Sequence, residues 1–122
     1  MARLNGRRNE EVHLLCLDGK REVINCVKID EGDACSTKVS TRKVIGTAVA
    51  ENAISVILAH NHPVGFAIPS GEDVEVTCRL AKALKTVDVY LLDHIIVTDR
   101  DYVSLREAGH YSPEACGIYL NL

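Results

Sequence analysis

The residues best suited to chemistry lie in the string His60-Asn61-His62-Pro63, which is followed ten residues later by Asp73. Side chains at i and i+2 of an extended chain point the same way, so both imidazoles can reach one ion. A carboxylate in the first turn of a following helix can turn back towards them. Two neutral nitrogens and one carboxylate oxygen form the ligand set of a catalytic Zn²⁺, which keeps a fourth position for a water whose pKa falls towards ~7. The spacing therefore predicts a zinc centre held by His60, His62 and Asp73.

Each member of this set also has a purely structural interpretation. Histidines that end a strand are usually solvated, and a lone His-x-His is weak evidence for a metal. Asp73 suits the first turn of a helix because a carboxylate complements the helix dipole, and Ser70 suits the N-cap position. The combination of both histidines with Asp73 at this spacing is what favours the metal.

The hydrophobic pattern predicts the elements that would position these side chains. The expected strands cover residues 10–17, 21–29, 54–59 and 87–98, with shorter ones near 37–39 and 102–105. The expected helices cover residues 40–52, capped by Ser40 or Thr41, and about 71–86, capped by Ser70. Turns or loops are expected at Asp18-Gly19 and over residues 30–33, 60–71 and 99–101. This order predicts an α/β domain with a mixed sheet and helices against it.

Length and composition fit one soluble globular domain, since the 122 residues are 47% hydrophobic and 25% charged. The formal net charge of −3 argues against a strong nucleic-acid-binding surface, and the one basic run consists of Arg3, Arg7 and Arg8. The sequence has no apolar run of the ~18–20 residues that a bilayer requires. The N-terminal residues also lack the apolar stretch of a signal peptide. We therefore expect no membrane association and a cytoplasmic location.

The five cysteines are odd in number and widely spaced, and no two form a Cys-x-x-Cys pair. This pattern argues against a disulfide framework and against a cysteine-rich zinc site. Cys16, Cys26 and Cys78 lie in stretches with an apolar pattern. They are therefore predicted to be small buried hydrophobic residues.

The string from His60 to Asp73 resembles the JAMM metal motif (His-x-His, ten residues, Asp) of the JAB1/MPN metallopeptidase superfamily. Other segments are similar to its bacterial RadC-like branch, and the resemblance covers roughly residues 10–109. These segments are the stretch containing Arg42, Ala59-HNHP-x-Gly, Pro69-Ser70-x-x-Asp73 and Leu91-Leu92-Asp93-His94-Ile95-Ile96-Val97. Val64 and Phe66 depart from the branch, which usually has small or polar residues there.

The resemblance implies a three-layer α/β fold of the JAB1/MPN type, similar to cytidine deaminases, with a mixed β-sheet flanked by helices. It implies an N-terminal extension over residues 1–9, a RadC-like JAB/MPN domain over 10–110 and a C-terminal tail over 111–122. It also implies Zn²⁺ held by His60, His62 and Asp73. Ser70 matches the motif serine that binds and polarises the scissile carbonyl.

Members of the superfamily use a glutamate on the first strand as general base. Glu10 and Glu11 are both candidates here. In RadC-like chains the glutamate lies eight residues before the residue that ends the strand, here Asp18, which selects Glu10. Two further polar residues precede the expected turn at residues 99–101. His94 is interpreted as a core histidine with satisfied hydrogen bonds, and Asp93 as a residue that could orient a ligand imidazole.

These observations predict a zinc-dependent metallohydrolase that cleaves an amide, peptide or isopeptide bond of unknown identity. The alternative is a non-catalytic JAB-fold accessory or binding module linked to DNA repair or recombination, and both readings leave room for a homodimer. An HNH nuclease signature spans a longer ββα element, and a zinc deaminase needs His-x-Glu with Pro-Cys-x-x-Cys. An amidohydrolase barrel needs more than 122 residues for its eight β/α units.

Overall fold

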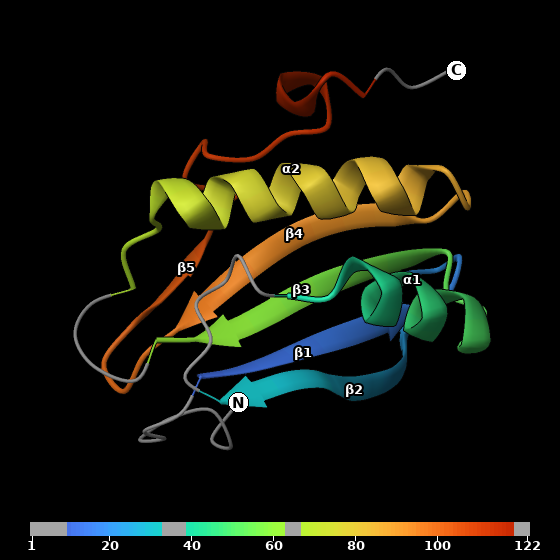
Figure 1. Ribbon diagram of the computed structural model, residues 1–122, viewed down its shortest axis with the longest axis horizontal. Coiled ribbons are helices and arrows are strands. Elements are labelled where there is room, and N and C mark those ends of the chain that lie inside the picture. Colours follow the sequence, from blue (N-terminus) through green and yellow to red (C-terminus); the bar gives the residue numbers. More distant parts are fainter. Residues whose placement is uncertain (1–9, 33–38, 63–66, 119–122) are drawn as a thin grey trace.

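A computed structural model describes residues 10–32, 39–62 and 67–118 of the chain. Its strands are β1 (Glu10–Leu17), β2 (Val23–Gly32), β3 (Ser55–Asn61), β4 (Tyr90–Val97) and β5 (Tyr102–Ser104). Its helices are α1 (Thr41–Ala50), α2 (Gly71–Lys85) and the short 3₁₀ helix η3 (Glu114–Cys116). The strands form one mixed sheet in the order β2-β1-β3-β4-β5, in which β3 with β4 is the one parallel pair of neighbouring strands (Figure 1). The α/β fold with a mixed sheet and flanking helices is thus confirmed.

Strand β2 is longer than its sequence suggests. The turn expected over residues 30–33 is wrong as far as residue 32, because β2 continues to Gly32 and pairs there with Glu10 of β1. Cross-strand pairing with the start of β1 outweighs the turn-forming composition of this stretch. The short strand expected near residues 37–39 lies outside the described residues except for Val39, which is buried and not in a strand.

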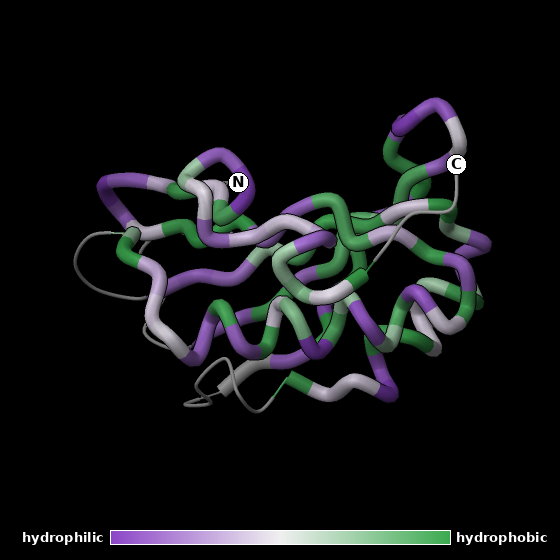
Figure 2. The backbone as a smooth tube through the Cα atoms, turned by 90° about the horizontal axis from the view of Figure 1, so that it is seen from above, coloured by the Kyte–Doolittle hydropathy of each residue, from purple (hydrophilic) through white to green (hydrophobic). Residues whose placement is uncertain are grey.

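Both long helices begin at serine caps. Ser40 accepts a hydrogen bond from the Lys43 N–H at 3.1 Å, and Ser70 caps α2. The two helices contact each other and lie on the same face of the sheet, as the view from above shows (Figure 2). This placement follows from right-handed crossovers between β2 and β3 and between β3 and β4, which progress in the same direction. The described residues therefore supply two of the three layers expected of the family fold.

A single hydrophobic core fills the space between the sheet and the helices. It takes alternate residues of the central strands and one face of each helix. Fully buried members include Leu14, Leu58, Leu80, Leu84 and Ile96. None of the described helices is long and apolar enough to cross a membrane.

The C-terminal segment is fastened to this core. Tyr111 is buried and donates a hydrogen bond from its hydroxyl to the Leu91 carbonyl at 2.6 Å. Cys116 of η3 forms a disulfide with Cys78 of α2 across 38 residues of sequence. The expectation that Cys78 is a simple buried hydrophobic residue is therefore wrong. Cysteine spacing did not reveal this pair because only the packing of η3 against α2 brings the two sulfurs together.

The other two described cysteines, Cys16 and Cys26, differ in burial. Cys16 is fully buried in the core, as predicted. Cys26 is exposed, so its prediction is wrong. It lies on β2, one of the two edge strands of the sheet.

Loss of the disulfide is expected to lower the free energy of unfolding by about 2–4 kcal/mol, because the closed loop of 38 residues restricts the unfolded chain. Denaturant unfolding of Cys116→Ser against the oxidised parent measures this change. Cys26→Ser is the matched control, since it removes an exposed thiol without opening a loop. Equal midpoints for the parent and Cys116→Ser would contradict the prediction.

Candidate metal centre

The candidate metal ligands meet where β3 ends and α2 begins. The loop expected from residue 60 starts two residues later, because β3 runs to Asn61 and His60 pairs with Val12 of β1. His62 follows the strand, and its N–H donates to the Val97 carbonyl at 2.9 Å. Asp73 lies in the first turn of α2 and is fully buried.

The three predicted ligands lie close together in space. His60 Nδ1 is 3.8 Å from Asp73 Oδ1, and His62 Nε2 is 3.6 Å from Asp73 Oδ2. The rings of His60 and His62 have centroids 4.7 Å apart. Metal–ligand bonds of ~2.0–2.1 Å in a tetrahedron place neighbouring donor atoms ~3.4 Å apart. The carboxylate therefore lies beside both imidazoles, although the compact donor groups of the described residues are Glu10 with His60 and His62, and Asp73 with His60 and His94.

Glu10 faces this centre from the start of β1. Its Oε1 lies 2.9 Å from His60 Nε2, and its side chain is 19% exposed. Ligand atoms of Glu10, His60 and His62 all lie within 4.8 Å of one another. Glu11 points elsewhere: it is buried and pairs with His13 Nε2 at 3.0 Å. Of the two candidate glutamates, the structure places only Glu10 beside the histidines.

Ser70 reaches the centre through Asp73. The Ser70 Oγ accepts the Asp73 N–H at 3.0 Å, and Asp73 Oδ2 accepts the Ser70 N–H at 2.8 Å. This reciprocal pair is a capping box, which satisfies two N–H groups at the start of α2. The same contacts hold the Asp73 carboxylate in place beside the histidines.

Replacing Ser70 by Ala is expected to lower the free energy of unfolding by about 0.5–2 kcal/mol, because the cap to the Asp73 N–H is lost. Thermal or denaturant unfolding followed by circular dichroism measures the loss. Ser70→Thr keeps a capping hydroxyl and serves as the control. An unfolding midpoint for Ser70→Ala that matches Ser70→Thr would show that the cap contributes nothing.

His94, which the sequence pattern placed in the core, is a direct neighbour of the centre. It is fully buried, and its Nε2 lies 3.2 Å from His60 Nδ1. A second compact group of possible metal donors consists of His60, Asp73 and His94. Sequence spacing did not reveal this neighbour, because β4 meets β3 only through the parallel pairing of the two strands.

A chain of hydrogen bonds fixes the protons on these rings. Thr77 Oγ1 donates its one proton to the Asp73 carbonyl at 2.5 Å, so His94 Nδ1, 2.6 Å from that oxygen, is the donor. Burial, with the nearby His60 and His62 as further causes, lowers the pKa of His94 to about 3, so the ring is neutral. Its Nε2 therefore accepts the Nδ1 proton of His60.

This arrangement of protons leaves two adjacent acceptors, His60 Nε2 and the Glu10 carboxylate, that suit a cation. With its proton on Nδ1, a neutral His60 ring presents the Nε2 lone pair to the Glu10 carboxylate 2.9 Å away. Two acceptors at that separation require a proton or a metal ion. The neighbouring Asp73 carboxylate raises the pKa of His62, against the effect of burial, and so also draws positive charge to this place. A set of two imidazoles and carboxylates suits Zn²⁺.

Asp93 does not orient a ligand imidazole, contrary to the hypothesis from sequence. Its Oδ1 accepts the backbone N–H groups of His94 at 2.7 Å and Arg106 at 3.0 Å. Its Oδ2 accepts the hydroxyl proton of Ser104. Asp93 therefore secures the turn after β5, and the side-chain partner of His60 on β4 is His94.

Comparison with known proteins places these residues in context. The sequence profile of the RadC-like JAB domain matches residues 1–110. UPF0758 proteins of Shewanella piezotolerans and Saccharophagus degradans are each 43% identical to this chain, over 109 and 108 residues, with 89% and 88% of this chain and 48% of each relative covered. A UPF0758 protein of Pelobacter propionicus is 43% identical over 102 residues, covering 84% of this chain and 44% of that protein. The chain thus spans about half the length of the curated relatives that it matches.

Proposed function

This chain belongs to the RadC-like JAB domain family, and from this membership and the geometry of the candidate centre we propose that it is a zinc-dependent metallohydrolase that cleaves an amide, peptide or isopeptide bond. One observation carries the proposal above the others. The Glu10 carboxylate lies 2.9 Å from His60, in the same compact group as His62. A potential proton acceptor therefore stands beside potential metal ligands.

His60, His62 and Asp73 are the residues that would hold the metal. His94 holds the Nδ1 proton of His60, and the capping box with Ser70 holds the Asp73 carboxylate. These partners reduce the freedom of the ligands before an ion arrives, and such contacts commonly strengthen metal binding. When bound, Zn²⁺ would supply Lewis-acid polarisation of a carbonyl group and lower the pKa of a water molecule to ~7.

Glu10 would act as the general base. It lies at the partly exposed margin of the centre, where a water molecule and a substrate can reach it. A carboxylate there can accept a proton from the attacking water and return it to the leaving amine, a role that requires hydrogen-bond reach of both groups.

Ser70 would stabilise the oxygen of the scissile carbonyl. Its Oγ accepts the N–H of Asp73, so the hydroxyl proton is directed elsewhere and can be donated to a developing oxyanion. The residue is exposed at the start of α2, on the same side of the centre as Asp73.

Metal analysis combined with an activity screen tests the proposal. We expect about one zinc ion per chain, as in a mononuclear catalytic site, and hydrolysis of at least one member of a panel of amide, peptide and isopeptide substrates. A chelator should remove this activity, and added Zn²⁺ should restore it. A folded chain that binds no zinc would overturn the proposal and favour the alternative of a non-catalytic JAB-fold module linked to DNA repair or recombination.

A further inference from the structure

A cavity lies far from the candidate metal centre. It has a volume of about 390 Å³ and lies on the face of the sheet that the helices leave uncovered. Leu91 faces the core, so Leu92, the next residue of β4, faces this cavity. Ser55 lines it from the first position of β3, ~17 Å from His60 at ~3.3 Å per strand residue. The two sites therefore occupy opposite ends of the same strand.

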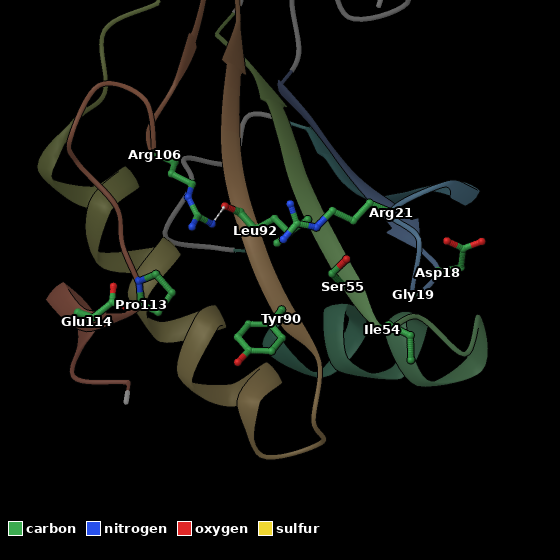
Figure 3. A pocket seen from close by; sticks show the side chains of 10 residues that line it. All are labelled: Asp18, Gly19, Arg21, Ile54, Ser55, Tyr90, Leu92, Arg106, Pro113 and Glu114. Carbon is green, nitrogen blue, oxygen red and sulfur yellow. Dashed lines mark hydrogen bonds between the residues drawn. The ribbon is translucent and has the colours of Figure 1, made fainter. Parts of the chain in front are cut away.

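Two guanidinium groups converge over this cavity from opposite sides. Arg106 reaches it from the segment after β5, and Arg21 reaches it from the turn between β1 and β2 (Figure 3). Arg106 is anchored because its Nη1 donates to the Leu92 carbonyl at 3.0 Å. Its remaining N–H donors stay available to a ligand.

Arg21 is held by an unusual backbone conformation. Its φ of 63° is in the left-handed region, which is unfavourable for a residue with a Cβ. Its N–H donates to the Asp18 carbonyl at 3.0 Å, and the Asp18 carboxylate accepts the N–H groups of Lys20 and Glu22. This bonded turn is what directs the Arg21 side chain over the sheet.

The two arginine side chains are not neutralised by ion pairs with the described carboxylates. In the part of the chain that the structure describes, neither guanidinium forms an ion pair with a carboxylate. Asp18 and Glu114 also line the cavity (Figure 3), and the Asp18 carboxylate accepts N–H groups of its own turn. The cavity therefore carries two guanidinium groups and two carboxylates, and neither carboxylate forms an ion pair with an arginine in the described part of the chain.

Apolar and aromatic side chains line the cavity beside the charged ones. Ile54, Tyr90, Leu92 and Pro113 line it, and its volume lies within the ~300–1,000 Å³ of ordinary ligand pockets. A guanidinium fork matches the oxygens of a carboxylate or phosphate, often through two parallel hydrogen bonds. We propose that this cavity binds an oxyanion, a carboxylate or a phosphate monoester, that carries an apolar group.

Amide chemical shifts of the full chain test this site with three probes that share one ring: phenyl phosphate, benzoate and the neutral phenol. Phenyl phosphate or benzoate should shift the amides of Ser55 and Arg106 and leave those of His62 and Asp73 unchanged. The stronger of the two anions identifies the head group. Shifts confined to His62 and Asp73 would overturn the proposal, as would phenol binding equally well. Inorganic phosphate must bind more weakly than phenyl phosphate, since otherwise the apolar side chains of the cavity play no part.

Arginine variants supply the second half of the test. Arg21→Gly removes one guanidinium and suits the left-handed turn, so we expect it to remain folded and to bind the preferred anion at least about tenfold more weakly. Arg106→Gln should show a similar loss. Arg100→Gln, an exposed arginine outside the cavity, is the charge-matched control and should bind as the parent does. An equal loss in Arg100→Gln would reduce the effect to general electrostatics and overturn the proposal.

Discussion

Replacing Glu10 by Gln is expected to leave zinc bound and to lower hydrolysis by roughly 10²–10⁴-fold, the usual contribution of a general base. Gln keeps the size of the side chain but cannot accept a proton from water. The three other side chains of the centre, His60, His62 and Asp73, are unchanged, so the metal content should stay near that of the parent. Initial rates on the best substrate from the screen, together with zinc analysis of the same sample, measure both quantities.

Glu11→Gln is the matched control for this experiment. It makes the same chemical change one residue along β1, where the carboxylate is buried against His13. We expect this variant to keep its activity, although the loss of the contact with His13 can reduce its stability. An active Glu10→Gln beside an inactive Glu11→Gln would show that the general base is Glu11.

Replacing Asp73 by Asn is expected to weaken zinc binding by more than the roughly 10–100-fold that follows loss of a partner of a metal ligand. The Asn amide oxygen can still accept the Ser70 N–H, so the capping box and the start of α2 should persist. The negative charge between His60 and His62 disappears, and with it the oxygen donor. Competition with a chelating indicator measures the affinity, and circular dichroism checks the helix.

Glu72→Gln controls for the loss of one negative charge in the same helical turn. Glu72 is exposed and neighbours Asp73 in the sequence, so its effect on the helix dipole is similar. We expect zinc affinity in this variant to match the parent. If Asp73→Asn also matched the parent, Asp73 would be a helix cap and not a ligand.

Helix starts and the relative direction of nearby side chains could be predicted from the sequence, because they depend on neighbouring residues. Ser40 and Ser70 are caps because each can satisfy an N–H group three residues ahead, and the structure confirms both helix starts. The His-x-His spacing predicts imidazoles on one side of an extended chain, and His60 and His62 do lie side by side. Patterns of this kind depend on neighbours within a few residues and need no knowledge of the fold.

Contacts between distant segments escaped prediction. His94 meets His60 across the parallel pair β3 and β4, 34 residues apart in sequence. The disulfide of Cys78 with Cys116 depends on how η3 packs on α2. The length of β2 depends on its pairing with β1. In each case the deciding interaction is a tertiary contact, which the local sequence pattern does not predict.

The capping box gives the Asp73 carboxylate two tasks, since it serves the start of α2 through Ser70 and stands beside both histidines. Binding of an ion to Asp73 would therefore be thermodynamically linked to local melting of that helical turn. A cation bound to the carboxylate would stabilise the first helical turn of α2 by mass action. By the same linkage, unfolding of that turn would weaken binding of the ion. Opening of this one turn is thus the shared event through which heat, denaturant or a competing chelator would act on both.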